Sequence, residues 1–143
     1  MKVLSFGSTH MNYIEKGRDI IFTDVCYIDV HTDEGVLKYT IKPGFVSDGR
    51  SGPEFIDPFV PHIGNNKTLD CWIIHDMNYY GFISKDLADD ILKQMLKIAD
   101  LGELKSDLVW CAVQMFGESS YGINTEDDRS MLKLIEFEWV DKK

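Results

Sequence analysis

The stretch "TLDCWIIHDMNYYGFISKDLADDILKQMLKIA", residues 68–99, decides the fold because it holds two helices and the turn between them. Thr68 is a suitable N-cap for a first helix over about residues 69–80, and Gly81 is suited to end it. Apolar residues lie on most sides of this helix. Such a helix is expected to be buried, together with any polar side chain that it carries.

Two more helices are predicted by their capping residues. Ser84 caps residues 85–99, where apolar residues recur at helical spacing, and Ser106 caps an apolar stretch over residues 107–117. Because the connections between the helices are short, the helices are expected to pack as antiparallel neighbours.

The first half of the chain is predicted to form strands. Residues 18–30 and 36–46 are rich in β-branched and aromatic residues, and residues 32–35 offer turn chemistry for a hairpin between them. Residues 131–140 alternate weakly and predict a returning strand. The fold class is therefore α+β: a small antiparallel N-terminal sheet, then an antiparallel helical hairpin and a third helix, with a C-terminal return strand.

The domain organisation follows from length and composition. The chain has 143 residues, of which 44% are hydrophobic, enough to build one core. We expect a single domain over residues 1–143, with strands in 1–46, an irregular functional loop in 47–66, helices in 67–117 and a C-terminal extension in 118–143. The loop contains three of the four prolines.

Net charge, apolar runs and cysteine content disfavour several classes of protein. A formal net charge of −9 disfavours nucleic-acid binding, which needs a basic surface. No run approaches the length of a membrane span, and the N-terminal residues lack the apolar segment of a signal peptide. Three cysteines without paired spacing predict no disulfide framework, and Cys71 and Cys111 are expected in the core.

The first helix carries the candidate site. Trp72, His75, Asp76 and Tyr79 share one face of it, because residues three, four and seven apart are neighbours on a helix. His75 and Asp76 therefore need a metal, a partner side chain or a substrate to solvate them. The plainer interpretation is a core histidine that is hydrogen-bonded to a neighbouring carbonyl or hydroxyl, with Asp76 in an ordinary ion pair.

The second helix offers a partner for His75. Asp89 lies at the border of its apolar stripe, so in an antiparallel hairpin it could approach the first helix and hydrogen-bond His75. A carboxylate behind an imidazole fixes its tautomer and stabilises its protonated form. Alternatively, Asp89 is a solvated residue on the flank of the stripe.

The loop after the strands offers oxygen ligands. Asp48 and Ser51 lie in the stretch "SDGRSGP", residues 47–53, where carbonyls and one carboxylate could bind a hard cation such as Ca²⁺. The same dipeptides are also common turn signals at the end of a strand.

Together these motifs resemble the phage-associated family of unknown function DUF1353, over about residues 40–117. The matching motifs are a strand ending in S/T-D-G-x-S-x-P, a helix with HDxxY, and a helix with an Ala-Asp pair. The matching positions are Asp48, Gly49, Ser51, Pro53, His75, Asp76, Tyr79, Ala88 and Asp89. The resemblance implies a phage-encoded protein, located in the bacterial host cytoplasm, in the phage virion, or in both.

The spacing of Cys71, His75, Asp76 and Tyr79 is also similar to that of secreted phospholipases A2. That likeness implies His75 as the base that activates water, with Asp89 and Tyr79 beside it, and Asp76 with the loop as ligands of Ca²⁺. It implies lipid or another ester as substrate. The chain departs from that family, because it lacks its glycine-rich calcium loop and disulfides and because its sheet precedes the helices.

Two functions therefore remain open. The preferred one is a structural component that contacts other virion proteins or a host protein, with Ser51, Phe55 and Phe59 in the binding surface. The alternative is a calcium-assisted hydrolase. A His-Asp phosphohydrolase is disfavoured, because His10, His31 and His62 lack the necessary spacing.

Overall fold

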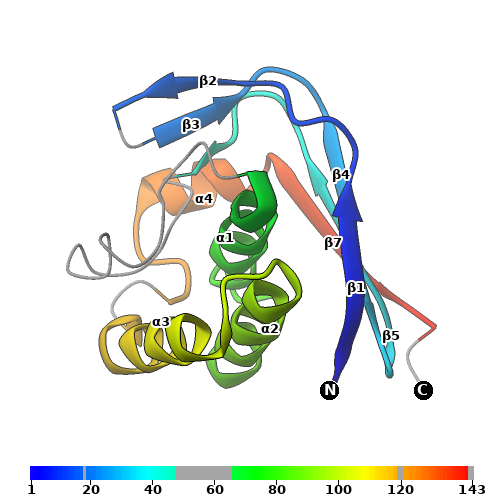
Figure 1. The fold of residues 1–143 in the computed structure, drawn as a ribbon. Coiled ribbons are helices and arrows are strands. Elements are labelled where there is room, and N and C mark those ends of the chain that lie inside the picture. The colour runs from blue at the N-terminus through cyan, green and yellow to red at the C-terminus, as the bar shows by residue number, and fades with distance from the viewer. Residues whose placement is uncertain (18, 48–65, 119–120, 142–143) are drawn as a thin grey trace. The chain divides into compact units, whose positions relative to one another are not determined.

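The computed structural model describes residues 1–17, 19–47, 66–118 and 121–141 (Figure 1). The chain divides into two compact units, one formed by Met1–Asp48 with Thr125–Lys143 and the other by Gly49–Asn124. Within the described residues, the first unit contains the sheets and one short helix, and the second contains three helices.

The first unit has two antiparallel sheets. The larger has the strand order β1-β4-β5-β7, and the smaller has the order β2-β3-β6 (Figure 1). The strands of the larger sheet are β1 (Val3–Ser8), β4 (Cys26–Thr32), β5 (Gly35–Ile41) and β7 (Ile135–Val140). Those of the smaller sheet are β2 (Tyr13–Lys16), β3 (Asp19–Phe22) and β6 (Val46–Ser47).

The predicted hairpin is confirmed as the β4–β5 pair, in register from Cys26↔Ile41 to Thr32↔Gly35. Gly35 is required at the turn, because its φ of 126° is left-handed and a Cβ would collide with the carbonyl oxygen of Val140. The predicted strand over residues 18–30 is instead two strands, β3 and β4, which belong to different sheets.

The C-terminal return strand is confirmed as β7, which pairs with β5, but it begins at Ile135, and the first two residues of the predicted strand, 131 and 132, belong to a helix. The sequence did not predict the helix before it, α4 (Glu126–Leu132). Thr125 and Asp128 form a capping box at its start: the Thr125 side chain accepts from the Asp128 backbone N–H, and the Asp128 side chain accepts from that of Thr125.

All three predicted helices are present: α1 (Asn66–Asn78), α2 (Lys85–Ile98) and α3 (Glu103–Phe116). Ser84 caps α2 as predicted, since its hydroxyl accepts from the Leu87 backbone N–H at 3.3 Å. The caps predicted at Thr68 and Ser106 are wrong, because both residues lie inside helices that begin earlier. Gly102, with a φ of 98°, lets the chain turn sharply before α3, which begins after a four-residue connection from α2.

α2 packs against both α1 and α3. The buried apolar residues of the three helices are Leu69, Cys71, Trp72, Ile73, Ile74, Met77, Ala88, Ile91, Leu92, Met95, Leu96, Val109, Ala112 and Val113. The expectation that Cys111 is a core residue is wrong. Val109, Ala112 and Val113 form the buried face of α3, and Cys111 lies on its exposed side.

The observed class is α+β, as predicted. Among the helices of the described residues, none combines the length and the apolar character that crossing a membrane requires.

Candidate functional site

α1 and the residue directly after it, Tyr79, position two rings of the candidate site. His75 and Tyr79 are one helical turn apart and both are buried, with ring centroids 4.2 Å from each other. Trp72, one turn before His75, meets its ring edge-on. Asp76 is half-buried. The rings of His75 and Tyr79 are therefore held inside the helical unit.

Asp89 of α2 meets these rings, as predicted from the helical projection. One carboxylate oxygen, Oδ1, lies 2.7 Å from His75 Nε2 and accepts a hydrogen bond of 2.6 Å from the Tyr79 hydroxyl. The sequence placed Asp89 at the border of the apolar stripe, and the structure buries it completely. Such a residue must be fully hydrogen-bonded, because an unpaired buried carboxylate is very costly.

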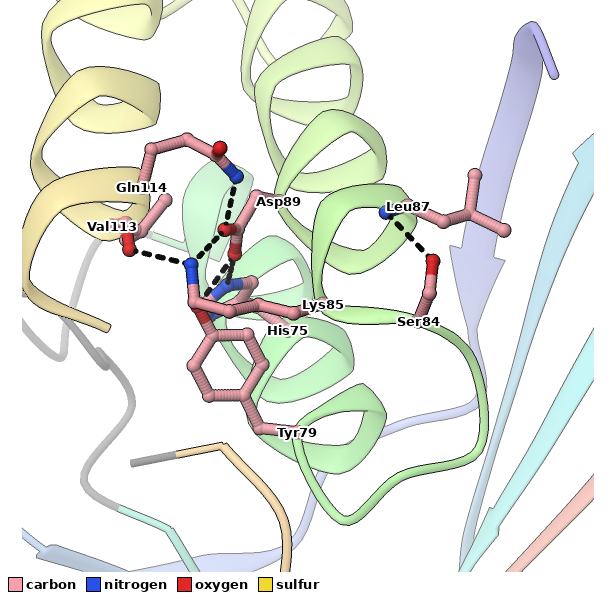
Figure 2. A network of polar contacts seen from close by, with 8 residues as sticks. All are labelled: His75, Tyr79, Ser84, Lys85, Leu87, Asp89, Val113 and Gln114. Carbon is pink, nitrogen blue, oxygen red and sulfur yellow. Dashed lines mark hydrogen bonds and ion pairs between the residues drawn. The ribbon is translucent and has the colours of Figure 1, made fainter. Parts of the chain in front are cut away.

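The second oxygen of Asp89 has partners that the sequence did not predict. Oδ2 accepts from the Lys85 ammonium at 2.8 Å and from the Gln114 amide at 2.5 Å. The Lys85 ammonium also donates to the carbonyl oxygen of Val113 at 3.1 Å. Figure 2 shows the resulting network, in which side chains from α1, α2 and α3 converge on one carboxylate.

The charge states follow from these contacts. Burial raises the pKa of the Asp89 carboxyl, but hydrogen bonds from His75, Lys85 and Tyr79 lower this pKa by more, so it lies below its ordinary value. Asp89 is therefore ionised at neutral pH and can only accept, which means that His75 Nε2 donates. Burial and the hydrogen bond to Asp89 raise the pKa of the Tyr79 phenol, which keeps its proton.

The loop after α3 holds Tyr79 in place. The backbone N–H of Gly122 donates to the Tyr79 carbonyl oxygen at 2.7 Å, and the Tyr121 ring packs edge-on against the Tyr79 ring. A Cβ on Gly117 would collide with the Tyr79 hydroxyl, so only glycine fits there. No local sequence signal indicates this role of Gly117, because its contact partner is 38 residues away along the chain.

Several predicted site residues lie outside the described residues: Asp48, Ser51, Phe55 and Phe59. The same holds for the predicted loop over residues 47–66, apart from Ser47 in β6 and Asn66 in α1. In the part of the chain that the structure describes, no group of three or more His, Cys, Asp or Glu side chains is arranged to hold a metal ion. The described residues thus contribute Asp76 alone to the predicted calcium ligands.

Fold and site together define an α+β protein with a buried carboxylate–histidine pair supported by three helices. The chain belongs to the family described as "Protein of unknown function (DUF1353)", which it matches over residues 21–113. This match includes His75, Tyr79, Lys85 and Asp89. No curated protein and no solved structure matches the chain at a significant level.

Proposed function

We propose that the chain is a hydrolase in which His75 activates water as a general base and Asp89 orients the His75 ring. The observation that carries this proposal is the 2.7 Å contact of His75 Nε2 with a fully buried, ionised Asp89. Because Nε2 donates to the carboxylate, the neutral ring carries its lone pair on Nδ1. That atom is the one that accepts a proton from water.

The reaction follows the chemistry of such a pair. As His75 Nδ1 takes a proton from water, the oxygen attacks the carbonyl carbon of an ester, and Asp89 stabilises the imidazolium that forms. The imidazolium then returns the proton to the leaving alkoxide, so charge and protons balance. Tyr79 keeps the accepting oxygen of Asp89 in place through its hydrogen bond of 2.6 Å. A lipid or another ester is the proposed substrate, on the strength of the HDxxY spacing.

A structural role is the second candidate, and the burial of the network favours it. His75, Tyr79 and Asp89 are all buried, and their hydrogen bonds join side chains from three helices. A satisfied buried network of this kind can specify a unique fold without any turnover. The protein would then be a phage component that contacts virion proteins or a host protein.

The variant His75→Gln separates the two candidates. If His75 is the base, we expect a folded variant whose hydrolytic rate falls by about 10²–10⁴-fold, since glutamine has no titratable nitrogen. If the role is structural, we expect a loss of roughly 1–3 kcal/mol of stability, because an altered donor pattern strands a buried partner. Ester, phosphodiester and amide substrates, assayed with and without Ca²⁺, Mg²⁺ and Zn²⁺, measure the first effect, and calorimetry measures the second.

The matched control is His31→Gln, which changes an exposed histidine of β4 and should alter neither the hydrolytic rate nor the stability. Wild-type protein without turnover on any of these substrates, combined with a lower melting temperature of His75→Gln, would contradict the hydrolase proposal.

Calcium binding is a separate part of the proposal. Asp76 is half-buried beside His75 and would supply a carboxylate oxygen, and calcium would polarise the ester carbonyl. A ligand that binds only the folded state raises the melting temperature by mass action, so millimolar Ca²⁺ should raise it in the wild type. In Asp76→Asn the rise should disappear. A wild-type melting temperature that does not respond to Ca²⁺ would remove calcium from the mechanism.

A further inference from the structure

Lys85 occupies a position that its own helix disfavours. It is the first residue of α2, where the helix dipole is positive and a cation is unfavourable. Its ion pair with Asp89 is an i,i+4 pair with the lysine first, which is the weaker order of the two charges on a helix. Local helix energetics therefore do not account for a lysine here, and such exceptions concentrate at functional sites.

In the part of the chain that the structure describes, the contacts of the Lys85 side chain lie at the candidate site. Its ammonium contacts Asp89 Oδ2 at 2.8 Å and the Val113 carbonyl at 3.1 Å, and it lies 5.9 Å from the centre of the Tyr79 ring. The Lys85 side chain is only 17% exposed. By contrast, the ammonium of Lys93, two turns later on α2, lies 4.5 Å from the ring centre of Trp110 in α3 and 3.9 Å from the carboxylate of Asp90.

The arrangement of hydrogen-bond donors fixes the orientation of the Asp89 carboxylate. Lys85 and Gln114 occupy Oδ2, and His75 and Tyr79 occupy Oδ1. With two donors on each oxygen, the carboxylate cannot rotate about its Cβ–Cγ bond without breaking hydrogen bonds. Residues behind a catalytic side chain commonly hold it in productive geometry in this way.

We propose that Lys85 is a positioning residue, which holds Oδ2 of Asp89 together with Gln114 and so directs Oδ1 at His75. This inference rests on the proposed function only in taking His75 as the base. Lys85 acts through Asp89 and contacts no reacting atom, so its effect is on the His75–Asp89 hydrogen bond.

Proton NMR of the His75 ring tests the proposal without any substrate. A buried ring N–H that donates to a carboxylate exchanges slowly with water and gives its own downfield signal. We expect this signal in the wild type and in the control Lys93→Met. In Lys85→Met, which keeps most of the length of the side chain but removes its charge and its donors, the signal should be lost or shifted.

A merely structural role for Lys85 would lower the melting temperature and leave the signal in place. A folded Lys85→Met variant with an unchanged His75 signal therefore overturns the proposal, as does the lack of this signal in the wild type. If Lys85→Met does not fold, Gln114→Leu, which removes the other donor to Oδ2, takes its place. A change of the His75 signal in Gln114→Leu, smaller than the one expected for Lys85→Met, supports the proposal. An unchanged signal in Gln114→Leu overturns it. Because turnover is not measured, failure of the hydrolase proposal is seen separately, in the substrate assays.

Discussion

Asp89→Asn should lose about 3–5 kcal/mol of unfolding free energy, the largest effect that we expect from any conservative substitution in this chain. The amide keeps the size of the carboxylate but places an NH₂ group against two hydrogen-bond donors. It also removes the negative charge that the Lys85 ammonium faces at 2.8 Å. Urea unfolding followed by circular dichroism measures the loss as a lower midpoint with an unchanged slope.

The neighbouring Asp90 provides a matched control. Its side chain is 40% exposed, accepts from Gln94 at 2.8 Å, and lies 3.9 Å from the Lys93 ammonium. Exposed pairs of this kind contribute little, so Asp90→Asn should change stability by less than about 0.5 kcal/mol. Equal losses in the two variants would show that the burial of Asp89 and its four donors have no special energetic role.

The contribution of Asp89 to the stability of the fold should decrease as the pH falls into the acid range. Its pKa is lower in the folded protein than in the unfolded chain, so its ionised form stabilises the fold above the ordinary aspartate value of 3.8. This contribution is lost as the pH falls through the lowered folded-state pKa. The stability difference between wild type and Asp89→Asn should thus be constant near neutral pH and shrink in strong acid.

The sequence predicted the elements that a strong local signal specifies. Ser84 is predicted as a cap because it stands directly before a stretch in which apolar residues recur at helical spacing. Both signals indicate the same helix start, and the structure has it there. α4 was missed because it has seven residues, none of them buried, and therefore no apolar periodicity. Ser106 was wrongly predicted as a cap because serine is common at caps, whereas here it is buried inside α3.

The candidate site was predicted only where helical geometry was sufficient. Projection of two helices brought Asp89 to His75, and the structure joins these residues at 2.7 Å. Lys85 and Gln114 could not be found in this way, because polar residues on a helix look alike in sequence whether or not they reach a buried partner. Their role depends on how α2 and α3 pack, which is a tertiary property.

Gly117→Ala should be the second most damaging small substitution, with a loss of about 1–3 kcal/mol. Gly117 ends α3 with an ordinary φ of −82°, so backbone strain is not the reason. The added methyl would instead collide with the Tyr79 hydroxyl and the Val113 carbonyl oxygen. Tyr79 would have to move, and its hydrogen bond to Asp89 would lengthen or break. Thermal or urea unfolding measures the loss.

Two further variants show whether this collision is the cause. Gly7 of β1 has a negative φ, and apart from its two chain neighbours no described residue has an atom within 4 Å of the position that an added methyl group would take, so Gly7→Ala should be neutral or slightly stabilising. In a Tyr79→Phe background the hydroxyl is gone, and Gly117→Ala should cost less than in the wild type, because contacting residues are not additive. An equal loss of stability in both backgrounds would show that the collision with the Val113 carbonyl oxygen alone is the cause. It would also show that the position of the Tyr79 side chain does not depend on Gly117.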